Sequence, residues 1–233
     1  MPSYVIHLAC ARQILKYCMP LSRQDENRFY IGSMAADMVR DKKNSHFWDD
    51  KTYQCLERKP NLTMFLERYG NRLQEPYVFG YYTHLYLDNL FLEQYWDKHF
   101  LFLDSDHQPE TDYNAVKYVK VTEQNRIYDR EMFFSKALYY GDYDRMNPYF
   151  AGKYALDIPD TERILSCKEA YSAIREIDWE ESLPILDDTL LFLQKSVREE
   201  KKENIKPPLN IFLLPELETM IDSAAKEMAR RYA

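Results

Sequence analysis

The sequence is poor in glycine, cysteine and long apolar runs, and each shortage excludes a class of protein. Only five of its 233 residues are glycine, and the long, charged and periodic segments between them favour helices over short strands with glycine-rich turns. The four cysteines form no Cys-x-x-Cys pair and are too few for a disulfide framework, so we interpret them as buried free thiols. No apolar run reaches the roughly 18 residues that span a bilayer.

Basic residues are also in the minority. The 31 lysines and arginines are outnumbered by 38 acidic residues, which gives a formal charge of −7 and a pI near 5.4. This balance argues against a broad basic footprint, so we expect no nucleic acid as a stable partner and no integral membrane contact. The amino terminus has no basic residue ahead of its apolar stretch, unlike a signal peptide, and we expect a cytoplasmic protein.

The apolar content, 45% of all residues, is enough for a sizeable core. We predict a single all-α domain over residues 1–233, with about eight to ten helices. The strongest apolar segment, 75–102, is apolar on nearly every face and is expected to be a central helix covered all round. The other expected helices cover 4–19, 23–37, 62–70, 122–140, 161–175, 183–203 and 215–231, and residues 104–112 and 141–159 are expected to be loops.

Histidine is scarce, with five residues in all, and one of them stands in a suggestive pattern. His84 and Asp88 are four residues apart on the expected central helix, so their side chains project from one face, one turn apart. An unpaired charge is costly in such apolar surroundings, so the two side chains need a partner. One metal ion bound to both would supply it. A direct His–Asp hydrogen bond or an exposed stripe is the structural alternative.

Three further polar residues lie in apolar surroundings upstream. His7 is on the core side of the first helix, Asp37 ends an apolar segment, and His46 follows nine residues later beside two aromatic residues. Each one alone is typical of a cap or a packed imidazole. Together with His84 and Asp88 they give three imidazoles and two carboxylates, a nitrogen and oxygen set that suits zinc, or iron or manganese in a more open site.

Four motifs that contain these residues, in this order, resemble the zinc-dependent phospholipase C family, which is related to bacterial phospholipase C and the S1/P1-type nucleases. They are the early His7, the Gly-Ser-x-x-x-Asp of 32–37, the Lys-x-x-Ser-His-Phe that ends at Phe47, and the Gly-Tyr-x-x-His-x-x-x-Asp of 80–88. The motifs lie within residues 1–95, and the expected helical remainder, 112–233, adds no further match.

The resemblance implies an all-helical fold of the phospholipase C and P1 nuclease kind, with up to three metal ions at the bottom of a cleft. By position, Asp37, His46, His84 and Asp88 correspond to the ligands of one ion, and His7 with the second oxygen of Asp88 corresponds to part of another site. The resemblance also makes Asp37 the candidate catalytic residue that takes a proton from the attacking water. The family's third ligand group, a further His followed by His-x-x-x-Glu, is absent, so we expect one or two zinc ions.

We therefore predict a metal-dependent hydrolase of a phosphate ester, similar to a phospholipase C phosphodiesterase, that uses a metal-activated water. Lys43, close to His46, is the candidate for contact with the substrate phosphate. The sequence leaves open whether that substrate is a lipid, a nucleotide or a soluble ester.

Two other functions remain as hypotheses. One is a non-catalytic helical binding or scaffold protein with a structural or vestigial metal site, which the missing third ligand group favours. The other is a phosphohydrolase of the His-Asp type, which is less favoured because none of the five histidines is followed by Asp.

Overall fold

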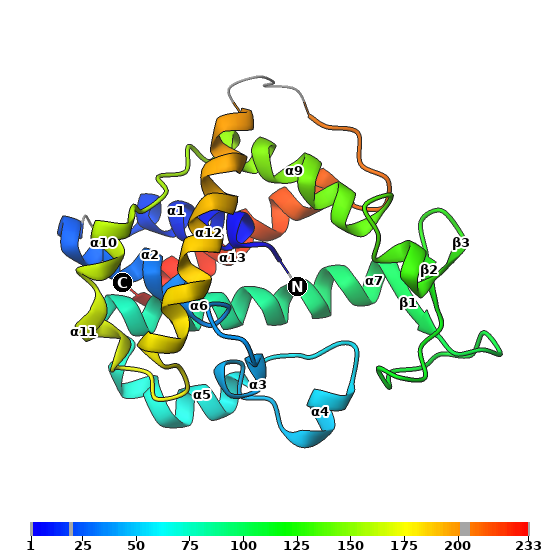
Figure 1. The fold of residues 1–233 in the computed structure, drawn as a ribbon, viewed down its shortest axis with the longest axis horizontal. Helices are drawn as coiled ribbons and strands as arrows, with labels where there is room; N and C mark the ends of the chain where they lie inside the picture. The colour runs from blue at the N-terminus through cyan, green and yellow to red at the C-terminus, as the bar shows by residue number, and fades with distance from the viewer. Residues whose placement is uncertain (1, 19–20, 201–205, 233) are drawn as a thin grey trace.

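Two helices that cross closely, α2 (Arg23–Ala35) and α6 (Pro76–Leu90), form the centre of the fold. The computed structural model describes residues 2–18, 21–200 and 206–232, shown as coloured ribbon in Figure 1. Most of α6 is buried on every side, as predicted for a central helix. It continues through a π-helical turn, η2 (Phe91–Trp96), and one further turn, α7 (Asp97–His99), into the strand that follows.

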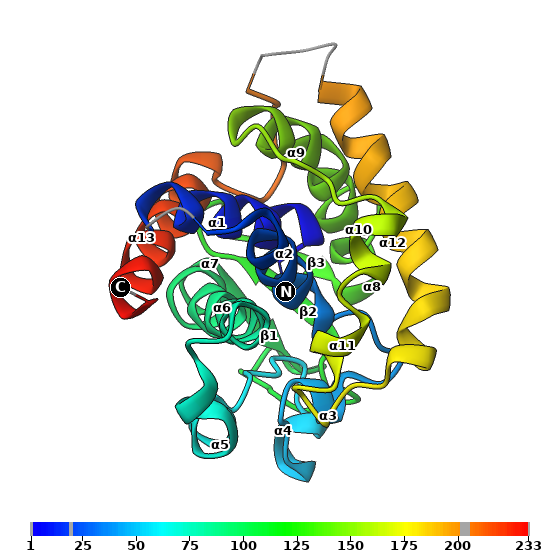
Figure 2. The ribbon, with the colours of Figure 1, turned by 90° about the vertical axis from the view of Figure 1, so that its left-hand side faces the viewer.

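The remaining long helices cover this centre in two pairs. The amino-terminal helix α1 (Tyr4–Tyr17) packs against the carboxyl-terminal helix α13 (Leu214–Tyr232), and α9 (Tyr139–Lys153) packs against α12 (Trp179–Glu200), as Figures 1 and 2 show. Shorter elements connect them: α3 (Lys42–Ser45), α4 (Asp50–Gln54), α5 (Leu62–Tyr69), η1 (Gly70–Arg72), α8 (Arg130–Phe133), α10 (Thr161–Leu165) and α11 (Lys168–Tyr171).

Several helices begin where the sequence predicts. Ser3 precedes α1, the hydroxyl of Ser22 accepts from the backbone N–H of Asp25, and the Asn61 side chain accepts from the N–H of Met64. Such side chains satisfy backbone donors that the first helical turn leaves free. None of the helices in the described part of the chain is long and apolar enough to cross a membrane.

The prediction of a purely helical chain is wrong in one region. Residues Phe100–Leu103, Tyr118–Val121 and Arg126–Asp129 form an antiparallel sheet in the order β1-β2-β3, at one end of the α6 rod (Figure 1). The expected helices over 75–102 and 122–140 therefore stop short or break at these strands. Alternating valines in β2 and a turn whose Asn125 has a φ of 48° are typical of such a hairpin, and they outweigh the weak helical periodicity.

The expected loop over 141–159 is also wrong in its first part, because α9 extends from Tyr139 to Lys153. Gly141 and Pro148 within this segment favour a loop by intrinsic propensity. Packing against α12 overrides that preference, and the chain leaves the helix only after Lys153. The predicted end of the helix over 183–203 lies partly outside the described residues.

Two glycines set how closely α2 and α6 approach. A Cβ atom on Gly32 would lie 2.1 Å from the carbonyl oxygen of Tyr77, and one on Gly80 would lie 2.2 Å from that of Phe29. Both oxygens belong to the backbone and cannot move aside as the end of a flexible side chain can. Any larger residue at either position must therefore push the two helices apart. The backbones of α2 and α6 therefore approach more closely than any residue other than glycine would allow at these two positions.

We expect Gly32→Ala and Gly80→Ala each to lower the free energy of unfolding by about 2 kcal/mol, because backbone displacement outweighs the better helix propensity of alanine. Urea denaturation followed by circular dichroism measures this. Gly70→Ala is the matched control, since the nearest atom to its Cβ would be 3.9 Å away and its stability should not fall. If Gly32→Ala and Gly80→Ala were as stable as Gly70→Ala, the close crossing of α2 and α6 would not restrict these positions to glycine.

Candidate metal centre

Five polar side chains converge where α1, α2 and α6 meet the segment after α2. His7 comes from α1, Asp37 follows α2, His46 follows α3, and His84 and Asp88 are one turn apart on α6. Asp37 is 7% exposed and the other four are at most 1% exposed. The structure thus brings together all five residues that the sequence singled out as ligands, including His84 and Asp88 on one helical face.

The imidazole nitrogens of His46 and His84 lie close to one oxygen each of Asp37 and Asp88. Nε2 of His46 lies 3.4 Å from Oδ1 of Asp37 and 3.2 Å from Oδ2 of Asp88. Nε2 of His84 lies 3.7 Å and 3.5 Å from the same two oxygens. An ion with four bonds of about 2.0–2.2 Å keeps its ligand atoms roughly 3.3–3.6 Å apart. The four nitrogen–oxygen distances, 3.2–3.7 Å, are close to that range.

The hydrogen bonds behind the imidazoles decide which nitrogen faces the cluster. Nδ1 of His84 lies 2.9 Å from the carbonyl oxygen of Ser33, which only accepts, so this nitrogen carries the proton. The hydroxyl of Ser45 donates to the Ala36 carbonyl at 2.7 Å and therefore accepts, at 2.9 Å, from Nδ1 of His46. When each imidazole is neutral, its Nε2 turns a lone pair toward the cluster, as in metal-bound histidines.

The structural alternative, a direct His–Asp hydrogen bond, requires a proton on Nε2. Burial lowers the pKa of His46, but Asp37 and Asp88 together raise it above its ordinary value. With both imidazoles neutral, Nε2 of His46 and of His84 and both oxygens of Asp88 are buried without a hydrogen-bond partner among the described residues. Buried polar groups in folded proteins are almost always satisfied, and here lone pairs face carboxylate oxygens. A cation at their centre would satisfy all of them together.

His7 extends the cluster on the other side of Asp88. Its Nε2 lies 3.3 Å from Oδ1 of Asp88, and its ring stacks on that of His84 with centroids 3.8 Å apart. Asp88 therefore directs one oxygen to His7 and the other to His46 and His84. This division is the one expected for a carboxylate shared by two ions. His7, Asp37 and His84 form a second group of potential ligands that overlaps the group of His46, His84 and Asp88.

Charge around Asp37 is balanced by Lys42, the neighbour of the lysine that the sequence analysis selected for substrate contact. Nζ of Lys42 lies 2.6 Å from Oδ1 of Asp37. Burial alone would raise the pKa of Asp37, but the ammonium of Lys42 and the two nearby imidazoles hold that pKa well below its usual value. Burial and the adjacent His84 lower the pKa of His7 to about 4, so this imidazole is neutral at pH 7.

Lys43, the predicted substrate-binding residue, lies outside the cluster. Its ammonium pairs with Asp50 and lies 5.5 Å from the ring centre of Tyr53. The two other histidines are also elsewhere: His99 lies 2.9 Å from a carboxylate oxygen of Glu216, and His107 stacks on a tyrosine of β2. Lys42, rather than its neighbour, is therefore the cation beside the candidate ligands.

Sequence reasoning missed the residues that orient the ligands. Ser33 and Ser45 fix the two imidazoles, and the hydroxyl of Tyr4 donates to the backbone carbonyl of Asp37 at 2.9 Å. The adjacent Ser45-His46 pair was an available signal for one of these contacts. The pairing of Ser33 with His84 depends on the crossing of α2 and α6 and has no local signal.

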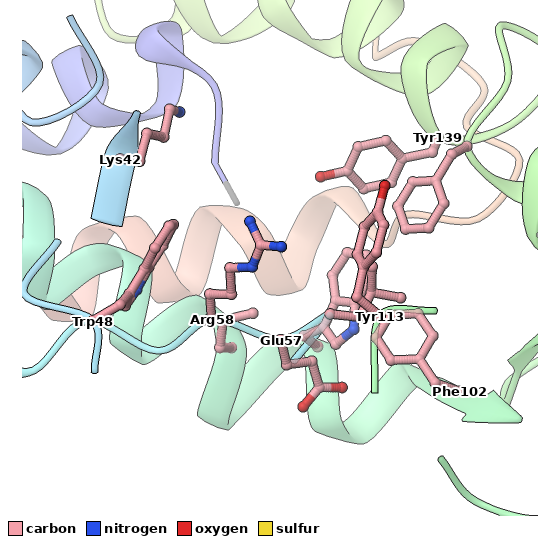
Figure 3. A pocket seen from close by; sticks show the side chains of 11 residues that line it. Lys42, Trp48, Glu57, Arg58, Phe102, Tyr113 and Tyr139 are labelled. Atoms are coloured by element: carbon pink, nitrogen blue, oxygen red, sulfur yellow. The ribbon is translucent and has the colours of Figure 1, made fainter. Parts of the chain in front are cut away.

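A pocket of about 250 Å³ adjoins the cluster (Figure 3). Lys42 and Trp48 belong to its wall, and the Trp48 ring lies 4.9 Å from the ring of His46. The opposite wall is largely aromatic and includes Phe102, Tyr113 and Tyr139. The candidate ligands thus have a hollow beside them rather than only packed core.

Comparison of the chain with protein-family models, curated proteins and solved structures finds no match. The resemblance to the phospholipase C family therefore rests on the four sequence motifs.

Protein purified without a metal-affinity tag is expected to carry about one or two equivalents of zinc by elemental analysis. His84→Ala and Asp88→Ala should each lose it, because each removes a central ligand. The control His107→Asn, in an exposed loop where its φ is 59°, should keep the metal. Metal-free protein in all four cases, even after zinc is added back, would rule the centre out.

Glu57, on the pocket wall, provides a test of stability against pH. Burial and the nearby carboxylate of Asp97 raise the pKa of Glu57 to about 7 from its ordinary value of 4.5. Between these two pH values the folded state therefore binds more protons than the unfolded state. The stabilisation from protonated Glu57 is fully present below pH 4.5 and is lost as the pH rises through 7. We expect Glu57→Gln to gain stability over the wild type between pH 5 and pH 8, as measured by urea denaturation. The exposed Glu67→Gln is the control, and a difference independent of pH would contradict the assignment.

Proposed function

We propose that this chain is a metal-dependent hydrolase of phosphate esters, with one or two zinc ions held by His7, Asp37, His46, His84 and Asp88. The observation that carries the proposal is the buried cluster of imidazole nitrogens and carboxylate oxygens 3.2–3.7 Å apart, which contains two overlapping groups of potential metal ligands. The donor set of imidazole and carboxylate is the one found in hydrolytic zinc sites. A bound ion supplies Lewis-acid chemistry and a water activated at neutral pH.

The chain's own groups have distinct parts in this proposal. Asp37 is the candidate proton acceptor, because it is the most exposed of the five, at 7%, and so is the one that a water molecule reaches most easily. Lys42 provides a positive charge beside Asp37, where a phosphoryl oxygen gains negative charge during attack. Its side chain is 35% exposed and therefore adjoins the pocket as well as the cluster.

The near-complete burial of the other four ligands supports a second candidate function, a metal site that only stabilises the fold. The hydrolytic and the purely structural metal site predict different roles for Lys42. A structural site needs no cation beside one ligand, whereas phosphoryl transfer depends on positive charge near the reacting oxygens.

The neighbouring lysines give a matched pair of variants for this question. We expect Lys42→Gln to lower kcat for a phosphodiester such as bis(p-nitrophenyl) phosphate by about 10- to 100-fold while the zinc content stays unchanged, since Lys42 is not a ligand. Lys43→Gln should leave kcat unaltered because Lys43 pairs with Asp50. Absence of hydrolysis by the zinc-loaded wild type across phosphomonoesters and phosphodiesters would favour the purely structural site.

A further inference from the structure

One arginine, Arg58, stands inside the pocket with its charge unpaired. Its guanidinium points into the space between the Trp48 side and the Tyr113 side, while the carboxylate of Glu57 points away (Figure 3). Three aromatic rings surround the guanidinium. Its carbon lies 5.5 Å from the ring centre of Trp48, 4.8 Å from that of Tyr53 and 5.5 Å from that of Tyr113. These ring faces hold the cation by cation–π attraction.

The hydrogen-bond donors of Arg58 are largely uncommitted. Its Nε donates to the carbonyl oxygen of Cys55 at 3.0 Å, but neither Nη atom has a hydrogen bond or a carboxylate partner among the described residues. Two other partly buried or exposed arginines do have carboxylate partners: Arg72 pairs with Glu75 and Arg163 with Asp157. A half-buried guanidinium with two free NH₂ groups matches the geometry of a phosphate, which it binds through parallel hydrogen bonds.

The pocket also limits the size of what it accepts. Apart from Lys42, Glu57 and Arg58, its lining is apolar or aromatic, including Leu92, Trp96 and Phe134. A cavity of about 150 Å³ is known to hold benzene, so a space of about 250 Å³ accepts a ring-sized group.

We propose that Arg58 binds the phosphate of the substrate and that the aromatic pocket binds a compact aromatic group carried by that phosphate. The inference rests on the proposed function, because the pocket shares Lys42 and Trp48 with the candidate metal centre. It makes the substrate class an aryl or similarly ring-bearing phosphate ester.

Calorimetric titration with three probes tests this without any turnover. We expect the purified protein to bind phenylphosphonate about tenfold more tightly than methylphosphonate, because the ring is buried, and to bind benzoate more weakly than phenylphosphonate. Arg58→Gln should weaken phenylphosphonate binding by roughly tenfold or more. Leu56→Trp, which fills the pocket, should abolish the preference for phenyl over methyl and leave methylphosphonate binding unchanged.

Arg126→Gln is the matched control, since Arg126 also lies over an aromatic ring, that of Tyr128 at 5.2 Å, but on the exposed β3 strand. Its binding should equal that of the wild type. Zinc content and melting temperature are measured for every variant, so that loss of the fold is not mistaken for loss of the site.

The proposal is overturned if wild type and Arg58→Gln bind phenylphosphonate equally, if the wild type binds none of the probes, or if benzoate binds as tightly as phenylphosphonate. Hydrolysis of phosphate esters with unchanged binding in Arg58→Gln would reject the pocket and keep the hydrolase. Arg58-dependent binding of phenylphosphonate without hydrolysis of any ester would keep the pocket and reject the hydrolase.

Discussion

The constraint on which this structure depends is the burial of hydrogen-bond acceptors that face one another. Two carboxylates and three imidazoles meet at the crossing of α2 and α6, and several of their atoms have no hydrogen-bond donor in the described structure. Desolvated acceptors at 3.2–3.7 Å repel each other unless protons or a cation lie between them. The glycine contacts that bring α2 and α6 together hold these groups at those distances, so the core is arranged around a site for positive charge.

Another buried carboxylate of this protein has a structural role, and its oxygens accept hydrogen bonds from several donors of the chain. Asp142 is fully buried, and it accepts backbone N–H groups from Asn210, Ile211 and Phe212 at 2.8–3.1 Å as well as pairing with Arg145. These contacts attach the segment before α13 to α9. Asp88 is equally buried and accepts no such donor. Asp88 instead faces the imidazoles of His7, His46 and His84.

The positive side chains near the centre extend this electrostatic arrangement into the pocket. Lys42 contacts Asp37, and Arg58 is held by aromatic rings with its NH₂ groups free. A positive charge in a largely aromatic hollow attracts an anion more strongly than it would in water, because the surrounding dielectric constant is low. In the proposed function, the metal centre and these two cations face the same anionic group from different sides.

The sequence by itself determined the features that depend on local spacing. His84 and Asp88 share a face because four residues make about one helical turn, and Ser22 and Asn61 cap helices through contacts within three residues. It also identified every residue of the candidate centre, since polar residues in apolar segments stand out. Only the tertiary structure decided features that depend on distant partners. The pairing of β1 with β2 and the helix of α9 follow from contacts far apart in the chain, which local periodicity does not encode. The choice between Lys42 and Lys43 is of the same kind: adjacent helical residues point about 100° apart, and only packing determines which of them meets Asp37.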